Sequence, residues 1–92
     1  MITVQVSGFL TDFTGGERTI ALDDAPTTVT EALSLLWRRH AGLHDRVVTE
    51  LGEVRPHVAV FVNADHIRHR DGLRTAVRDG DEITILPAIS GG

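Results

Sequence analysis

The chain has 92 residues, of which 41% are hydrophobic and 24% charged, which indicates one small globular domain. It contains no cysteine, which excludes disulfides, cysteine-ligated metals and thiol catalysis by this chain. The net charge of −4 argues against general binding to nucleic-acid phosphates, and no apolar run approaches the roughly 20 residues needed to span a bilayer. With no signal peptide visible after Met1, we expect a cytoplasmic protein without nucleic-acid or membrane partners, too small to enclose a deep enzyme pocket.

The first part of the chain predicts an antiparallel hairpin with a long loop. Ile2, Val4 and Val6 alternate with polar residues, which is typical of a half-buried strand. A turn at Gly15-Gly16 then leads into a second strand over residues 18–22.

Residues 29–41 predict an amphipathic helix. Thr28 and Glu31 have the spacing of a capping box, and Gly42 is a suitable residue just after the last turn. The helix would bury one apolar stripe, formed by Val29, Ala32, Leu33, Leu36 and Trp37.

The second half predicts three more strands and no further helix. Residues 43–57 read as irregular, 58–62 as a central strand, 66–69 as a short edge strand and 82–86 as the last strand, which Pro87 ends. One helix must bury its stripe against a mixed sheet of about five strands, which makes a two-layer α+β domain. We expect this domain to span residues 1–87, with Leu33, Leu36 and Val60 in its core, followed by a flexible tail over 88–92.

The terminal pair Gly91-Gly92 suggests chemistry. Glycines lack Cβ atoms, so such a tail can enter a narrow channel and present its carboxylate to another protein. That carboxylate becomes an electrophile once it is converted into an acyl-adenylate, which a sulfur nucleophile can attack. Taken alone, however, two glycines fit a frayed terminus better.

The neighbouring residues carry a more specific pattern. Val62-Asn63 closes a strand, Asp79-Gly80-Asp81-Glu82 turns into the last strand, and Pro87-Ala88 leads to the two glycines. In these residues the chain resembles the MoaD/ThiS family, the ubiquitin-like β-grasp sulfur carriers of molybdopterin, thiamin and cysteine biosynthesis. The resemblance covers residues 58–92 in detail and the whole chain in element order. A longer segment before the Asp79-Gly80 turn, and Pro-Ala in place of Pro-Pro, are most similar to actinobacterial carriers that feed a cysteine synthase.

The resemblance implies a ubiquitin-like β-grasp fold and a protein substrate rather than an enzyme. Gly92 would be adenylated by an E1-like enzyme that uses ATP and magnesium, while the carrier itself binds no cofactor. A persulfide sulfur would then replace the adenylate and leave a Gly92 thiocarboxylate for a sulfur-accepting biosynthetic enzyme. The residues that would contact these partners are Leu86 and Phe61 on the surface and Pro87, Ala88, Ile89, Ser90 and Gly91 in the channel.

Other candidate sites are weaker. His66 and His69 have a spacing found in zinc sites, but in a strand they would point to opposite faces, so solvated histidines are the favoured interpretation. Phe9 and Phe13 could belong to a partner patch or cover the edge of the core. Eight of the nine arginines lie within residues 38–78, where they could dock an acidic partner or simply form a solvated surface.

Three hypotheses remain open. The first is a sulfur carrier, and the second is a ubiquitin-like modifier joined through Gly92 to lysines of other proteins. The two differ in the fate of Gly92, thiocarboxylate against amide. The third is a β-grasp interaction module whose tail has no chemical role.

Overall fold

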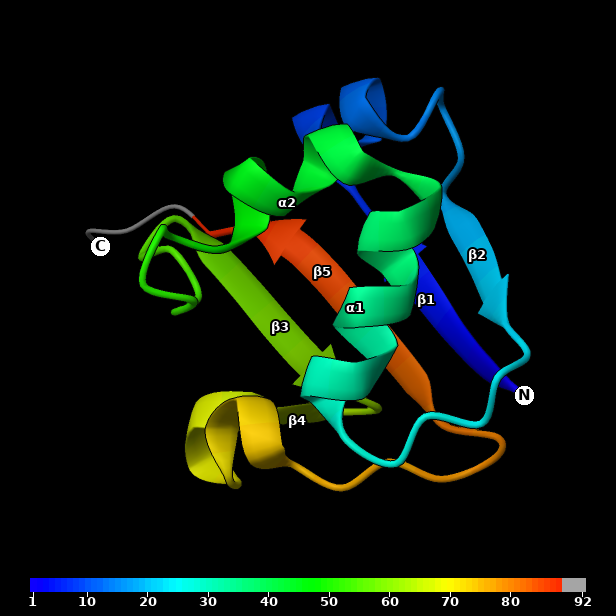
Figure 1. Ribbon diagram of the computed structural model, residues 1–92. Helices are drawn as coiled ribbons and strands as arrows, with labels where there is room; N and C mark the ends of the chain where they lie inside the picture. Colours follow the sequence, from blue (N-terminus) through cyan, green and yellow to red (C-terminus); the bar gives the residue numbers. More distant parts are fainter. Residues whose placement is uncertain (89–92) are drawn as a thin grey trace.

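The computed structural model describes residues 1–88 and has two layers, a five-stranded mixed sheet and a helical layer on one face (Figure 1). The sheet order is β2-β1-β5-β3-β4, with β1 and β5 parallel at its centre and the other neighbours antiparallel. This confirms the predicted α+β class and mixed sheet. The strands are β1 (Ile2–Val6), β2 (Thr19–Leu22), β3 (Val58–Val62), β4 (Asp65–His66) and β5 (Glu82–Pro87).

The first hairpin forms as the alternating pattern predicts. Ile2, Val4 and Val6 are buried, and β1 pairs with β2 from Ile2 opposite Leu22 onward. The long connection contains a 3₁₀ helix, η1 (Gly8–Phe13), which buries Leu10. This turn was not visible in the sequence because it has only one buried apolar residue.

Helix α1 (Val29–Arg39) begins after the predicted N-cap Thr28, but one of the two capping hydrogen bonds differs from the prediction. The Thr28 hydroxyl accepts a hydrogen bond from the Glu31 N–H at 3.1 Å, as a capping box requires. The Glu31 carboxylate accepts from the N–H of Thr27 at 2.9 Å, one residue earlier than in a capping box. The Glu31 N–H is thus satisfied by the Thr28 hydroxyl, and the Val29 N–H donates to the Thr75 carbonyl at 3.0 Å, while the Glu31 carboxylate lies at the positive end of the helix dipole.

The prediction of a single helix is wrong. The chain breaks at His40 and forms a second helix, α2 (Ala41–Val47), within the segments assigned to the end of the first helix and an irregular connection. Leu43 and Val47, four residues apart, are both fully buried, and their burial holds α2 against the core. That spacing was present in the sequence, but Gly42, read as the end of the first helix, obscured it.

The short edge strand is also shifted. β4 ends at His66, and residues Ile67–His69 form the 3₁₀ helix η2 in place of the predicted strand. The His66 Nδ1 atom accepts a hydrogen bond from the Arg68 N–H at 3.1 Å, which stabilises this bend, and Ile67 turns into the core. A further 3₁₀ helix, η3 (Gly72–Arg74), packs near the start of α1.

The predicted core is confirmed. Leu33, Leu36 and Val60 are 2%, 0% and 0% exposed. Trp37 is only partly buried, on the margin of the core, where its ring meets that of His44 edge to face at 5.4 Å. Within residues 1–88, no helix is long and apolar enough to cross a membrane.

Candidate functional site

The strand that leads to the tail, β5, lies in the middle of the sheet. It pairs in parallel with β1 and antiparallel with β3, so hydrogen bonds anchor it on both sides. The ladder reaches one residue past the predicted domain boundary at Pro87, because the Ala88 N–H donates to the His57 carbonyl at 2.7 Å. The predicted tail residues Ile89, Ser90, Gly91 and Gly92 lie outside the described residues, so their roles stay predictions.

Pro87 belongs to β5 and does not end it, contrary to the prediction. The Ala88–His57 bond shows that residues 86 and 88 turn their backbone groups toward β3, so the nitrogen of Pro87 faces the β1 side. β1 has already ended at Val6, so no ladder bond is lost where proline lacks an N–H.

Gly8 packs against the proline ring at this point. A Cβ atom on Gly8 would lie 2.9 Å from Pro87 Cγ and 3.2 Å from Cδ, and Gly8 has a φ of +64°. Only glycine meets both the close approach and the left-handed backbone without strain. The base of the tail is therefore held between His57 on one side and Gly8 on the other.

The two predicted surface residues lie on the same face of the sheet, opposite the helices. In the β3–β5 register Phe61 faces Thr84 and Ala59 faces Leu86, so Leu86 is the diagonal neighbour of Phe61. Both side chains are half-buried. They form a small apolar patch close to the tail, whereas Gln5 and Glu82, hydrogen-bonded at 3.4 Å, lie farther along the same face.

The Asn63 and Asp81 motif residues lie at the opposite end of β5. The Asn63 N–H donates to the Glu82 carbonyl at 2.7 Å, and its side-chain oxygen accepts from the Glu82 N–H at 3.0 Å. The side-chain amide also donates to the Asp81 carboxylate at 3.1 Å, and this bond is the main reason that the pKa of Asp81 is lowered. The motif therefore fixes the register of β3 against β5 and contributes to the site by holding the strand that carries the tail.

The histidine pair is arranged differently from the prediction. Because η2 replaces a strand, the His66 and His69 rings meet at a centroid distance of 6.1 Å instead of pointing to opposite faces. His66 also packs edge to face on Phe61 at 5.0 Å, and burial, followed by the charge of Arg68, lowers its pKa. Among the described residues, no three His, Asp or Glu side chains come together in a way that could hold a metal ion.

Two hollows flank the base of the tail, and sequence reasoning missed both. One, of about 600 Å³, is lined by Phe9, Phe13, Arg46 and His57 among others, with the Arg46 guanidinium 4.6 Å from the centre of the Phe13 ring. Phe9 is 55% exposed, as predicted for a residue of a partner patch. Phe13 is half-buried, as predicted for a residue that covers the edge of the core. The other, of about 450 Å³, includes Ala88 in its wall.

Comparison with known proteins gives a consistent result. The ThiS family matches residues 4–92. The sulfur carrier protein CysO of Mycobacterium tuberculosis is 32% identical over 93 residues, which cover 99% of this chain and 98% of the relative. Small archaeal modifier protein 3 of Haloferax volcanii is 41% identical over 70 residues, covering 76% of this chain and 73% of the relative.

Solved structures agree with the fold. The Amycolatopsis orientalis BexX/CysO complex contains a chain with a TM-score of 0.88 and 37% identity, and the alignment covers 100% of both chains. The Mycobacterium tuberculosis CysO structure has a TM-score of 0.87 and 31% identity, and the alignment covers 97% of this chain and 100% of that one. The predicted ubiquitin-like β-grasp fold is therefore confirmed.

Proposed function

Since the chain belongs to the ThiS family, we propose that it is a sulfur carrier that works through a thiocarboxylate on Gly92. In the first step an oxygen of the Gly92 carboxylate attacks the α-phosphorus of ATP on an E1-like enzyme, and pyrophosphate leaves. A persulfide sulfur then attacks the acyl carbon, and AMP leaves. A second thiol then attacks the enzyme sulfur of this acyl disulfide and forms a disulfide with it, and the thiocarboxylate leaves on the carrier.

The single observation that carries this proposal is the anchoring of the tail. β5 is paired on both sides, and the Ala88–His57 bond of 2.7 Å extends this anchoring to the first residue of the predicted tail. A partner that draws the last residues into its active site would therefore meet a rigid base. Since the chain has no cysteine, it has no side-chain thiol that could carry sulfur instead. ATP and magnesium belong to the activating enzyme, and the carrier contributes the acyl group.

The sulfur acceptor is proposed from the relatives. Two of them are named CysO, and one of these occurs in a complex with BexX, so a similar chain associates with another protein. We place the acceptor among enzymes that build sulfur-containing metabolites, with a cysteine synthase first and molybdopterin, thiamin and natural-product enzymes next. Leu86 and Phe61 are the proposed surface contacts for such partners.

Reconstitution tests this proposal. The chain is incubated with the E1-like enzyme of its own organism, ATP, magnesium and a persulfide donor, and its intact mass is measured. We expect ATP–pyrophosphate exchange and a gain in mass equal to the difference between sulfur and oxygen. A chain that lacks Gly92 is the control and should show neither. ATP–pyrophosphate exchange with the control, or a mass gain elsewhere in the chain, would show that Gly92 is not the residue that carries the sulfur.

Conjugation to other proteins is the second candidate function. It is favoured by the 41% identity with small archaeal modifier protein 3 over 70 residues. The chain itself contains no lysine, so it cannot build homopolymers through its own side-chain amines. The two functions share the adenylation step and differ in the nucleophile that follows, a sulfur or a lysine amine.

A further inference from the structure

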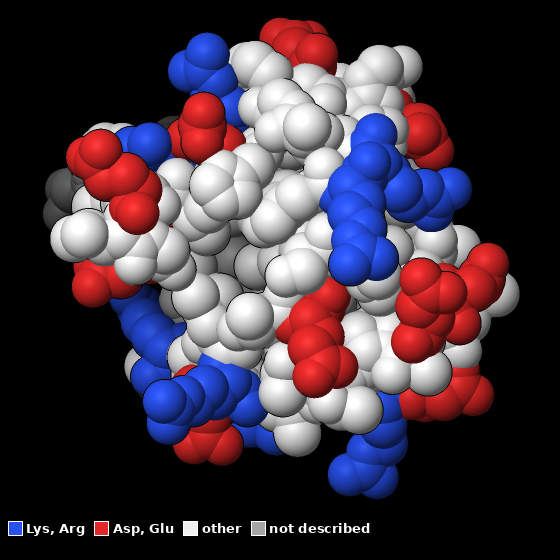
Figure 2. Space-filling model, in the orientation of Figure 1, with Lys and Arg blue, Asp and Glu red and all other residues white. Residues whose placement is uncertain are grey.

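A hollow of about 450 Å³ lies on the helix side of β3, beside the base of the tail (Figure 2). It is on the opposite face of the sheet from Phe61 and Leu86, because Val58 points toward the core while Phe61 points away from it. We call it the tail-base hollow. Its apolar walls are Val54, Pro56, Val58, Ile67, Leu73 and Ala88.

The hollow exists because α1 lies over the centre of the sheet and leaves the start of β3 to shorter segments (Figure 1). One wall comes from a small hairpin in which Val48 and Val54 pair and the Thr49 N–H donates to the Glu53 carbonyl at 2.7 Å. The other wall comes from η2 and η3. The hairpin tip carries Leu51, which is 81% exposed. The hairpin whose base lines the hollow therefore also carries an exposed leucine at its tip.

The border of the hollow is basic, although the whole chain is acidic. Arg55 and Arg68 lie at the rim, together with Glu53 and His66. Arg55 is held in place by a 2.6 Å hydrogen bond from its Nε to the Asp45 carbonyl, and Arg68 by a 3.3 Å contact with the His69 ring. In the described part of the chain, neither arginine forms an ion pair with a carboxylate.

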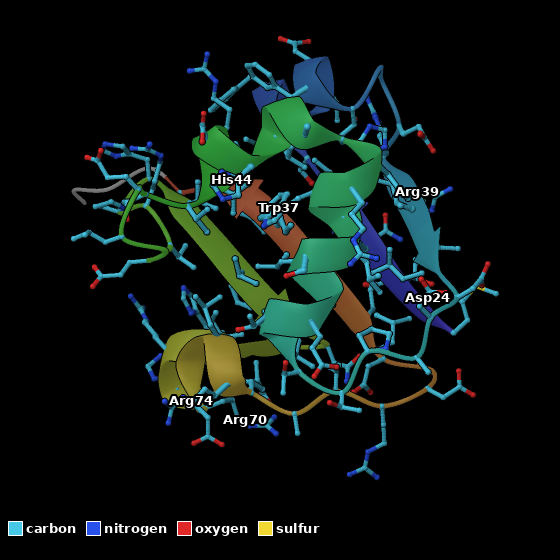
Figure 3. All side chains as sticks on the ribbon, viewed as in Figure 1. Asp24, Trp37, Arg39, His44, Arg70 and Arg74 are labelled. Atoms are coloured by element: carbon cyan, nitrogen blue, oxygen red, sulfur yellow. The ribbon has the colours of Figure 1, made fainter. Side chains whose placement is uncertain are left out.

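Further arginines extend this positive region. Arg70 and Arg74 project from the turns below the hollow (Figure 3), and Arg70 pairs with Asp65 at 3.0 Å. In Figure 2 the arginine side chains border the lower left of the hollow. A partner with carboxylates beside an apolar side chain would match both the walls and the rim.

We propose that the tail-base hollow docks a protein segment in which an apolar side chain is flanked by carboxylates, on the same partner that receives the tail. The apolar side chain would enter between Val54 and Leu73, and the carboxylates would pair with Arg55 and Arg68. Ala88 is part of the wall, so a partner that holds the tail is brought to the hollow without further movement. The identity of that partner rests on the proposed function, whereas the binding chemistry does not.

The binding chemistry is tested with the chain alone. The full chain, labelled with ¹³C in its methyl groups, is titrated with an acetylated and amidated Asp-Leu-Glu peptide, and then with a Lys-Leu-Lys peptide as a charge-reversed control. We expect the acidic peptide to shift the methyl signals of Val54, Ile67 and Leu73 with a dissociation constant on the order of 1 mM, a value typical of short weak ligands. The basic peptide should leave these signals unchanged.

Two arginine variants make the test specific. Arg68→Glu should weaken binding of the acidic peptide at least several-fold, while Arg38→Glu, the same charge change on an exposed α1 residue outside the hollow, should not. No response of the hollow methyls to the acidic peptide would overturn the proposal, and so would an equal response to both peptides or an equal loss in both variants.

The link to the partner is tested in the adenylation assay. Arg68→Glu and Leu51→Ser should raise KM for the carrier several-fold and leave kcat unchanged, because they change docking and not the reacting group. If the wild-type chain is not adenylated at all, the proposed function fails, while the peptide titration still decides whether the hollow binds such a segment. Adenylation with unchanged KM in both variants would overturn the second part of the proposal, that the docked segment lies on the partner that receives the tail.

Discussion

Replacing Gly8 by alanine tests how firmly the base of the tail is held. Gly8 has a φ of +64°, which costs a residue with a Cβ atom about 1–2 kcal/mol. The new methyl group would also lie 2.9 Å from Pro87 Cγ, an atom of a closed ring that cannot swing away. Overpacking of this kind costs about 1–3 kcal/mol, so we expect Gly8→Ala to lower the free energy of unfolding by about 2–5 kcal/mol.

Gly15→Ala is the matched control. Gly15 has nearly the same φ, +65°, but nothing lies within 4 Å of its hypothetical Cβ. It therefore measures the cost of the backbone conformation alone, and the difference between the two variants measures the contact with Pro87. A difference of at least about 1 kcal/mol corresponds to about 4–8 °C in Tm for a domain of this size. Thermal and urea unfolding of both variants would show it, and a Gly8→Ala variant as stable as Gly15→Ala would refute the proposed packing at the tail base.

Three further results are expected. Leu36→Ala should lower the free energy of unfolding in urea by about 2–5 kcal/mol, because Leu36 is 0% exposed. Leu35 is only partly buried, so Leu35→Ala should lower it clearly less. Equal losses in the two variants would contradict the assigned core face of α1. Asn63→Ala should lower the free energy of unfolding at neutral pH, because the lowered pKa of Asp81 stabilises the fold while its carboxylate is charged. The difference in unfolding free energy from the wild type should therefore narrow as pH falls below about 4. A difference that stays constant with pH would show that the Asn63–Asp81 bond contributes nothing. Deleting Gly91 and Gly92 should abolish sulfur transfer and leave Tm nearly unchanged, and a large loss of Tm would instead give the tail a structural role.

The sequence predicted those features that depend on strong local patterns. The alternation in β1, the Thr28 cap and the stripe of α1 each contain several residues that favour the same element, so the class of fold and the core positions Leu33, Leu36 and Val60 were correct. Features set by contacts between distant residues were missed or wrong. α2 depends on burial of Leu43 and Val47 against the rest of the core, and the extension of β5 through Pro87 depends on where β1 ends.

The candidate site shows the same division. The motif around Asn63 and Asp81 pointed to the correct family, and the structure adds that these residues act by fixing the strand that carries the tail. The Gly8–Pro87 contact joins residues at opposite ends of the chain, and the tail-base hollow combines three separate segments. No local pattern indicates such combinations, because they arise only once the sheet has formed.

The most direct test of the account is the mass of the protein recovered from its native cells. The account predicts mainly unconjugated chain, with a fraction that is heavier by the difference between sulfur and oxygen and carries this change on Gly92. Fragmentation of the intact protein would place the change, and treatment with an alkylating reagent that reacts with thiocarboxylates would shift that fraction and no other, since the chain has no cysteine. Recovery mainly as adducts with an amide between Gly92 and lysines of other proteins would contradict the sulfur-carrier account and favour the modifier.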